Sequence, residues 1–221
     1  MIDFVAARRM MVDGQVRTSD VTDLRVIGAM LAIPRERFVP ETKAALAYLD
    51  LDLPVLEGRE SMRCLLKPMV LAKLIQAADV KDDDLVLDVG CATGYSSAIL
   101  GRLAGSVVAL EQDATLARRA EENLLAVGAQ KVTVVIETMA AGWPAGGPYD
   151  VIVLNGASEV VPKALLGQLK SGGRLVGVIG RSPTSKAMFY RSVGGEVSGR
   201  SIFDATAAPL PGFAEPAAFV F

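Results

Sequence analysis

The sequence of 221 residues contains no histidine and only two cysteines, Cys64 and Cys91. Without histidine, the chain cannot use a Ser–His or Cys–His nucleophile, a histidine-bound metal or an imidazole base that titrates near neutral pH. Two isolated cysteines make neither a metal cluster nor a disulfide framework, and we interpret them as buried structural thiols. We therefore expect chemistry that needs neither imidazole nor metal.

An excess of one charge and long apolar runs are also missing. Twenty-three basic and twenty-five acidic residues give a formal net charge of −2, which argues against a nucleic-acid partner. No run approaches the roughly 18 apolar residues of a membrane span, and the first residues lack the apolar stretch of a signal peptide. Because 51% of the residues are hydrophobic, the chain can bury a substantial core. We expect a cytoplasmic protein without a membrane partner.

Hydrophobic patterning divides the chain into a helical first part and an α/β remainder. We expect two helices within residues 3–33, separated around Thr18-Ser19-Asp20, whose small polar side chains can cap the second helix. Pro34 ends that helix. The next segment, 35–69, has few clear periods and several prolines. We interpret it as a cap or lid with a short helix near 41–47.

From residue 81 onwards, short apolar segments alternate with helical ones, a pattern typical of a parallel sheet. The expected strands are 85–89, 107–110, 132–136, 151–154 and 174–179. The expected helices are 95–103, 113–127 and 162–169. Three apolar segments then follow without helices, and we expect them to close the sheet as antiparallel strands: 187–193, 197–203 and 217–221.

The most informative motif is Asp88-Val89-Gly90-Cys91-Ala92-Thr93-Gly94-Tyr95, which follows the first expected strand and precedes a helix. Glu111 stands at the end of the next strand. In an open parallel sheet, such a crossover opens at the carboxyl edge, where ligands bind. Small residues let the backbone approach a ligand, and an acid at the second strand end can accept both hydroxyls of a ribose. The motif therefore predicts a nucleoside-containing cofactor.

Other glycine-rich sites fit less well. A dinucleotide fingerprint needs glycines where this loop has Ala92 and Tyr95, and a Walker loop needs a Gly-Lys-Ser/Thr that follows no strand here. The carboxylate of Asp88 would repel a phosphate, but it suits a cationic sulfonium or ammonium group. Taken singly, Gly90 and Gly94 could be turn glycines and Glu111 a capping acid. Their combined order favours the cofactor site, and an NAD-dependent dehydrogenase is the weakest alternative.

The loop and Glu111 resemble the signature with which class I methyltransferases bind S-adenosyl-L-methionine (SAM). Further segments resemble, in the same order, the protein-L-isoaspartate O-methyltransferases: Arg35-x-Arg37-Phe38-Val39-Pro40, Ala47-Tyr48-Leu49-Asp50, Leu53-Pro54, Gly142-Trp143-Pro144, Pro148 to Val153 and Gln168 to Val176. The resemblance implies a doubly wound α/β, Rossmann-like fold with a mostly parallel seven-stranded sheet. It divides the chain into a helical N-terminal cap with a substrate-side loop, 1–69, and a SAM-binding domain, 70–221.

The family's activity is methyl transfer from SAM to the α-carboxylate of an isoaspartyl residue in damaged protein, a protein-repair reaction. Such an acceptor suits a chain without histidine, because a carboxylate is already ionised near neutral pH and needs alignment and desolvation rather than a base. The resemblance implies a set of cofactor-binding residues at matching positions: Asp88, Gly90, Cys91, Gly94, Glu111, Gln112, Thr138, Met139 and Asn155.

The sequence departs from the family between Gly58 and Val70, where the family has a serine beside the transferred methyl group. Counting from one end of this stretch puts Ser61 close to that position, and counting from the other puts Leu65 there. Ser61 is therefore the candidate catalytic residue.

Three cations of the same stretch could receive an anionic substrate or belong to a mixed surface loop: Arg59, Arg63 and Lys67. The segments at 155–159 and 203–213 also differ from the family. The acceptor is therefore an isoaspartyl protein or peptide, or a different protein or small-molecule acceptor. A SAM-binding protein without catalytic activity is the third interpretation.

Overall fold

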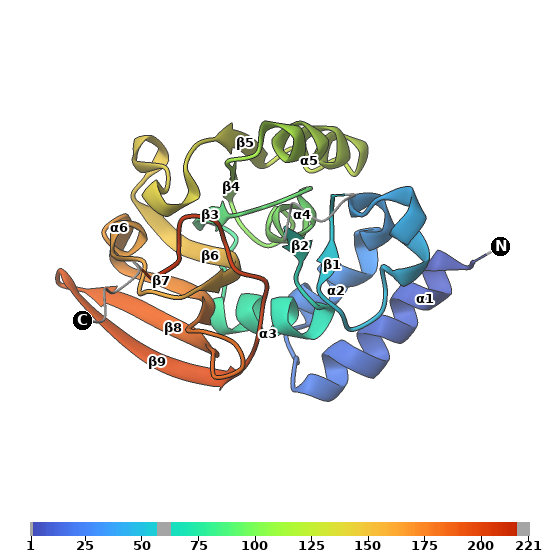
Figure 1. The fold of residues 1–221 in the computed structure, drawn as a ribbon, viewed down its shortest axis with the longest axis horizontal. Helices are drawn as coiled ribbons and strands as arrows, with labels where there is room; N and C mark the ends of the chain where they lie inside the picture. The colour runs from blue at the N-terminus through green and yellow to red at the C-terminus, as the bar shows by residue number, and fades with distance from the viewer. Residues whose placement is uncertain (1, 57–62, 216–221) are drawn as a thin grey trace, which may run out of the picture.

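The structure, a computed structural model, describes residues 2–56 and 63–215 (Figure 1). Its centre is a seven-stranded sheet in the order β5-β4-β3-β6-β7-β8-β9. The strands are β3 (Leu85–Val89), β4 (Ser106–Glu111), β5 (Val132–Ile136), β6 (Tyr149–Ser158), β7 (Leu169–Ile179), β8 (Lys186–Val193) and β9 (Glu196–Asp204). All pairs from β5 to β7 are parallel, and β8 and β9 add antiparallel pairs. The expected fold class is confirmed.

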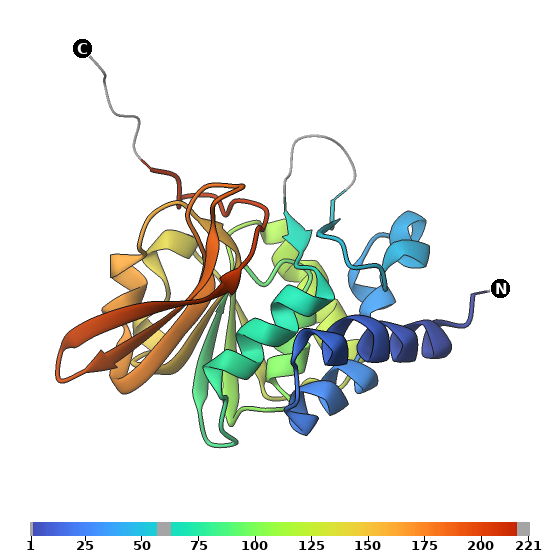
Figure 2. The same cartoon turned by 90° about the horizontal axis from the view of Figure 1, so that it is seen from below.

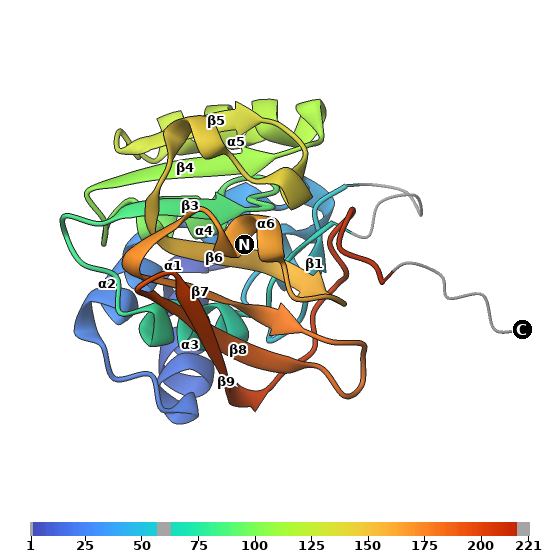
Figure 3. The ribbon, with the colours of Figure 1, turned by 90° about the vertical axis from the view of Figure 1, so that its left-hand side faces the viewer.

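Helices cover both faces of this sheet, which is why its central strands are mostly apolar. Successive residues of a strand point to opposite faces, so Val86 and Val151 enter one core while Leu87 and Ile152 enter the other. The first core contains residues of α3 (Pro68–Ala78), α4 (Tyr95–Leu100) and α5 (Ala114–Ala126). The second contains residues of α6 (Lys163–Leu166) together with Leu210 and Phe213. Figure 3 shows the strands one above the other in sheet order.

The N-terminal segment lies against α3, at the opposite end of the molecule from the β8–β9 hairpin (Figures 1 and 2). Its elements are α1 (Phe4–Met11), a π-helical turn (Val12–Val16), a 3-10 turn (Arg17–Ser19), α2 (Leu24–Ala32), the 3-10 helices η3 (Arg35–Phe38) and η4 (Glu41–Leu46), and the short strands β1 (Leu53–Pro54) and β2 (Cys64–Leu65). The expected helices are therefore present. The boundary at residue 69 between cap and domain stays a prediction.

Three details differ from the sequence expectations. Asp23, rather than the residues at 18–20, caps α2, because its side chain accepts a hydrogen bond from the Arg25 amide at 2.8 Å. The patterning predicts no element between 70 and 80, yet α3 lies there. Seven of its eleven residues are buried, and only two polar residues, Lys73 and Gln76, interrupt its apolar sequence, so the polar face is narrow.

The third difference is α6, which has four residues instead of the expected eight, because β7 already begins at Leu169 beside Tyr149. The expected strand at 217–221 lies outside the described residues. None of the helices in the described part of the chain is long and apolar enough to cross a membrane.

Truncation of α3 tests this packing. Leu74 of α3 is wholly buried, and Leu74→Ala should lower the free energy of unfolding by about 2–5 kcal/mol through lost burial and the cavity left behind. Leu125→Ala is the matched control, because the side chain of Leu125 on α5 is 84% exposed. Urea unfolding measures both. Equal midpoints for the two variants would contradict the central position of α3.

Candidate functional site

The loop after β3 turns sharply beneath the end of β4. The amides of Gly90 and Cys91 both donate to the carbonyl of Leu110, at 2.8 and 3.1 Å. Gly90, Ala92 and Gly94 have positive φ angles of 75°, 53° and 94°. Two of these positions carry glycine, for which the left-handed conformation is not strained, whereas Ala92 is held there at a cost of about 1–2 kcal/mol. The strain at Ala92 therefore requires a compensating interaction.

Glu111 provides that interaction. It is the last residue of β4, and its side chain is fully buried. Its Oε2 accepts hydrogen bonds from the Ala92 amide at 2.9 Å and from Nη2 of Arg63 at 2.6 Å. Its Oε1 accepts from the amides of Gln112 and Asp113 at 3.0 and 3.2 Å. The carboxylate thus fixes the turn, and each of its oxygens already has two donors.

Asp88 lies below the loop, in β3, and is also fully buried. It accepts hydrogen bonds from the hydroxyls of Ser96 and Ser97 on α4 and from the amide of Asn155 on β6. Burial raises the pKa of Asp88 to about 6, although these three hydrogen bonds act in the opposite direction. The acid therefore joins three elements around the loop.

The space above the loop is filled by side chains of the protein itself. A methyl group on Gly90 would lie 2.9 Å from Cδ2 of Leu210, 3.1 Å from Nη2 of Arg63 and 3.2 Å from Sδ of Met139. The cavity left beside Gly90 and Asn155 has a volume of about 10 Å³, against the 300–1,000 Å³ or so typical of ligand pockets. In this conformation the carboxyl edge of the sheet is closed.

Leu210 reaches the loop from the segment 205–213, which follows β9 and runs beside the end of β6. The Leu210 amide donates to the carbonyl of Ala157, and the Ala157 amide donates to the carbonyl of Ala208, both at 2.8 Å. A methyl group on Gly156 would lie only 2.7 Å from the Leu210 side chain. Glycines at 90 and 156 therefore leave the room that this leucine occupies.

The structure brings together most of the predicted cofactor-binding residues. Those buried around the turn are Asp88, Gly90, Cys91, Gly94, Glu111, Met139 and Asn155. Gln112 and Thr138 are exposed just after the ends of β4 and β5. Burial raises the pKa of the Cys91 thiol well above its usual range, which keeps this cysteine in its unreactive form. Ser61 and Arg59 lie outside the described residues.

Sequence reasoning missed two contacts of the site. One is the ion pair of Arg63 with Glu111, and the other is the close approach of Leu210 to Gly90. Arg63 is separated from Glu111 by 48 positions, and no local pattern links two such residues. The only signal was that the segments around both residues depart from the family pattern.

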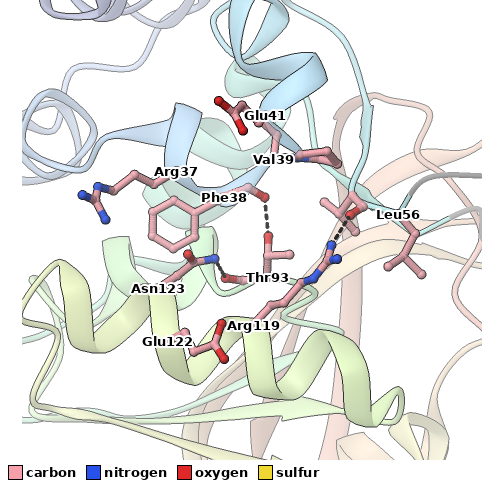
Figure 4. A pocket seen from close by; sticks show the side chains of 11 residues that line it. Arg37, Phe38, Val39, Glu41, Leu56, Thr93, Arg119, Glu122 and Asn123 are labelled. Carbon is pink, nitrogen blue, oxygen red and sulfur yellow. Dashed lines mark hydrogen bonds between the residues drawn. The ribbon is translucent and has the colours of Figure 1, made fainter.

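A larger cavity, of about 450 Å³, lies on the other side of the loop between η3, α5 and the residues that follow β1 (Figure 4). Thr93 is its link to the loop, because the Thr93 hydroxyl donates to the carbonyl of Phe38 at 2.5 Å while its own carbonyl accepts from Asn123 at 3.1 Å. Neither Asp88 nor Glu111 lines this cavity. It is therefore distinct from the closed edge above Gly90.

Comparison with known proteins identifies the family. The sequence model of the family "Protein-L-isoaspartate(D-aspartate) O-methyltransferase (PCMT)" matches residues 7–210. A protein-L-isoaspartate O-methyltransferase of Methanoculleus marisnigri is 38% identical over 173 residues, which cover 78% of this chain and 77% of the relative. One of Roseiflexus sp. is 35% identical over 211 residues, or 96% of this chain and 94% of the relative.

Solved structures agree with the fold. A protein-L-isoaspartate O-methyltransferase superposes with a TM-score of 0.81 at 25% identity, covering 93% of this chain and 66% of that protein. A putative member from Plasmodium falciparum, crystallised with S-adenosyl-L-homocysteine, has a TM-score of 0.76 at 17% identity and covers 92% of this chain and 97% of its own. The second likeness concerns the fold alone.

The raised pKa of Asp88 gives a pH test. Because the folded protein holds this proton more tightly than the unfolded chain, Asp88 stabilises the fold most below about pH 4 and loses that contribution as the pH rises through about 6. The free energy of unfolding of the wild type, relative to Asp88→Asn, should therefore fall by ~2 kcal/mol between pH 4 and 7. Denaturant titrations at several pH values measure it, and parallel pH curves for both proteins would contradict it.

Proposed function

Because the chain belongs to the protein-L-isoaspartate(D-aspartate) O-methyltransferase family, we propose that it transfers a methyl group from SAM to the carboxylate of an isoaspartyl residue in a protein or peptide. The observation that carries this proposal is the buried carboxylate of Glu111 at the end of β4, against a loop with glycines at 90 and 94. This arrangement suits the hydroxyl groups of a ribose at the carboxyl edge of the sheet.

The donors and acceptors of the site fit SAM. When bound, the cofactor supplies a methyl group on a positively charged sulfur atom. Glu111 would hold the ribose, the backbone from Gly90 to Gly94 would lie against the aminoacyl part, and Asp88 and Asn155 would lie beneath the loop. Gln112, Thr138 and Met139 follow the neighbouring strand ends, where the base would lie. The volume is available only when Arg63 and Leu210 leave the space above Gly90.

A carboxylate acceptor agrees with the composition. The chain has no histidine to serve as a base, and an ionised carboxylate requires none. What the protein must supply is a dry site in which the acceptor oxygen is aligned with the methyl group. Met139, whose Sδ lies beside Gly90, gives the edge an apolar wall, which supports such a role.

The finer assignments remain predictions. Ser61 is still the candidate catalytic residue, and a different protein or small-molecule acceptor is the alternative to an isoaspartyl one. The net charge of −2 supports a partner other than nucleic acid. Cytoplasmic location is likewise part of the proposal.

The acceptor is tested with tritiated SAM, an isoaspartyl peptide and the same peptide with ordinary aspartate. We expect counts on the isoaspartyl peptide alone, released as methanol in mild alkali because a methyl ester has formed. Equal background counts on both peptides would exclude the repair activity. If S-adenosyl-L-homocysteine still binds in that case, the protein is instead a SAM-binding protein that does not methylate this acceptor.

The role of Glu111 is tested by Glu111→Gln. The amide cannot accept as many hydrogen bonds as the carboxylate, so the Kd for S-adenosyl-L-homocysteine in calorimetry should rise at least about tenfold. Glu121→Gln, on the exposed face of α5, is the matched control and should leave the Kd unchanged. An unchanged Kd in Glu111→Gln would remove this residue from the cofactor site.

A further inference from the structure

Arg63 occupies a hydrogen-bond acceptor that the ribose of the cofactor needs, the carboxylate of Glu111. Its side chain is 7% exposed, and its Nη2 lies 2.6 Å from Oε2 of Glu111. The same nitrogen would lie 3.1 Å from a methyl group on Gly90. Arg63 therefore touches both features that define the cofactor site, the acid at the end of β4 and the glycine of the loop.

The remaining donors to Glu111 cannot easily be exchanged. They are the backbone amides of Ala92, Gln112 and Asp113, which belong to the loop and to the turn after β4. Only the guanidinium is attached by a flexible side chain that can rotate away without unfolding either turn. Two ribose hydroxyls that reach Glu111 must therefore compete with Arg63 for Oε2.

A displaced guanidinium needs another anion. Asp88, the neighbouring buried acid, already receives three donors from the protein. Arg63 directly precedes β2, and Cys64 and Leu65 of that strand line the small cavity beside Gly90 and Asn155. The rotated side chain thus remains next to the space in which an acceptor would be methylated. Guanidinium groups bind carboxylates in a planar, often bidentate geometry.

We propose that Arg63 binds two carboxylates in turn: Glu111 when the cofactor is absent, and the carboxylate of the methyl acceptor once the ribose has taken Glu111. This inference rests on the proposed function. Arg63 holds one acceptor oxygen and leaves the other free to react, so it acts as an acceptor-binding residue. The exchange makes binding ordered, because the guanidinium of Arg63 becomes available to the methyl acceptor only after the cofactor has bound.

The test uses Arg63→Met, which keeps an unbranched apolar stem and removes the charged guanidinium. In calorimetry the variant should bind S-adenosyl-L-homocysteine about tenfold more tightly, because the competitor is gone. Its KM for the isoaspartyl peptide should rise at least about tenfold, with a smaller change in kcat, because the acceptor has lost a charged hydrogen bond. Arg17→Met, which removes the exposed ion pair with Asp13, is the matched control and should change neither value.

Arg63→Lys is a second variant that controls for misfolding of Arg63→Met. It keeps the charge without the planar guanidinium, so its cofactor affinity and KM should lie between those of the wild type and Arg63→Met, while thermal unfolding monitors the fold of both variants. An unchanged Kd for S-adenosyl-L-homocysteine in Arg63→Met overturns the competition, and an unchanged KM overturns the acceptor role.

The same measurements separate this inference from the proposed function. If the wild type binds no S-adenosyl-L-homocysteine but Arg63→Met does, the competition is supported. If neither protein binds it, the cofactor assignment fails and the inference fails with it. If the wild type binds and transfers methyl groups and Arg63→Met behaves identically, only the inference fails.

Discussion

The site depends on one buried carboxylate, that of Glu111, which has four hydrogen-bond donors. Three of them are backbone amides, and through them the acid holds the end of β4 to the loop that follows β3. The unfavourable left-handed conformation of Ala92 persists because its amide is one of these donors. The fourth donor is the side chain of Arg63. Glu111 therefore stabilises the loop through its backbone donors and can exchange its side-chain donor for a ligand.

The fold was predictable wherever apolar residues follow a short, regular period. β3, β4 and β5 were expected almost to the residue, because all three are nearly continuous runs of β-branched and aliphatic residues, although only β3 and β4 are mostly buried. α3 was missed for the same physical reason. It is buried on most sides between the sheet and the N-terminal helices, so its polar face is reduced to Lys73 and Gln76, too few residues to set the helical period apart.

The site was predictable where it is local in sequence. The loop from Asp88 to Gly94 and the acid one strand later form a pattern that follows directly from the first crossover of a parallel sheet. The contacts of Arg63 and Leu210 could not be predicted, because both residues reach the loop from segments that are distant in sequence and have no regular period. The sequence could thus indicate which groups would face a ligand, whereas the closed state of the edge depends on tertiary packing.

The attachment of the segment 205–213 has an evolutionary consequence. Its hydrogen bonds to Ala157 are made by backbone atoms alone, so this attachment does not depend on which side chain stands at position 210. Residue 210 can therefore vary in size during divergence while the chain around it keeps its course. Relatives that share this attachment could acquire wider or narrower entrances through single substitutions, without rebuilding the sheet that supports them.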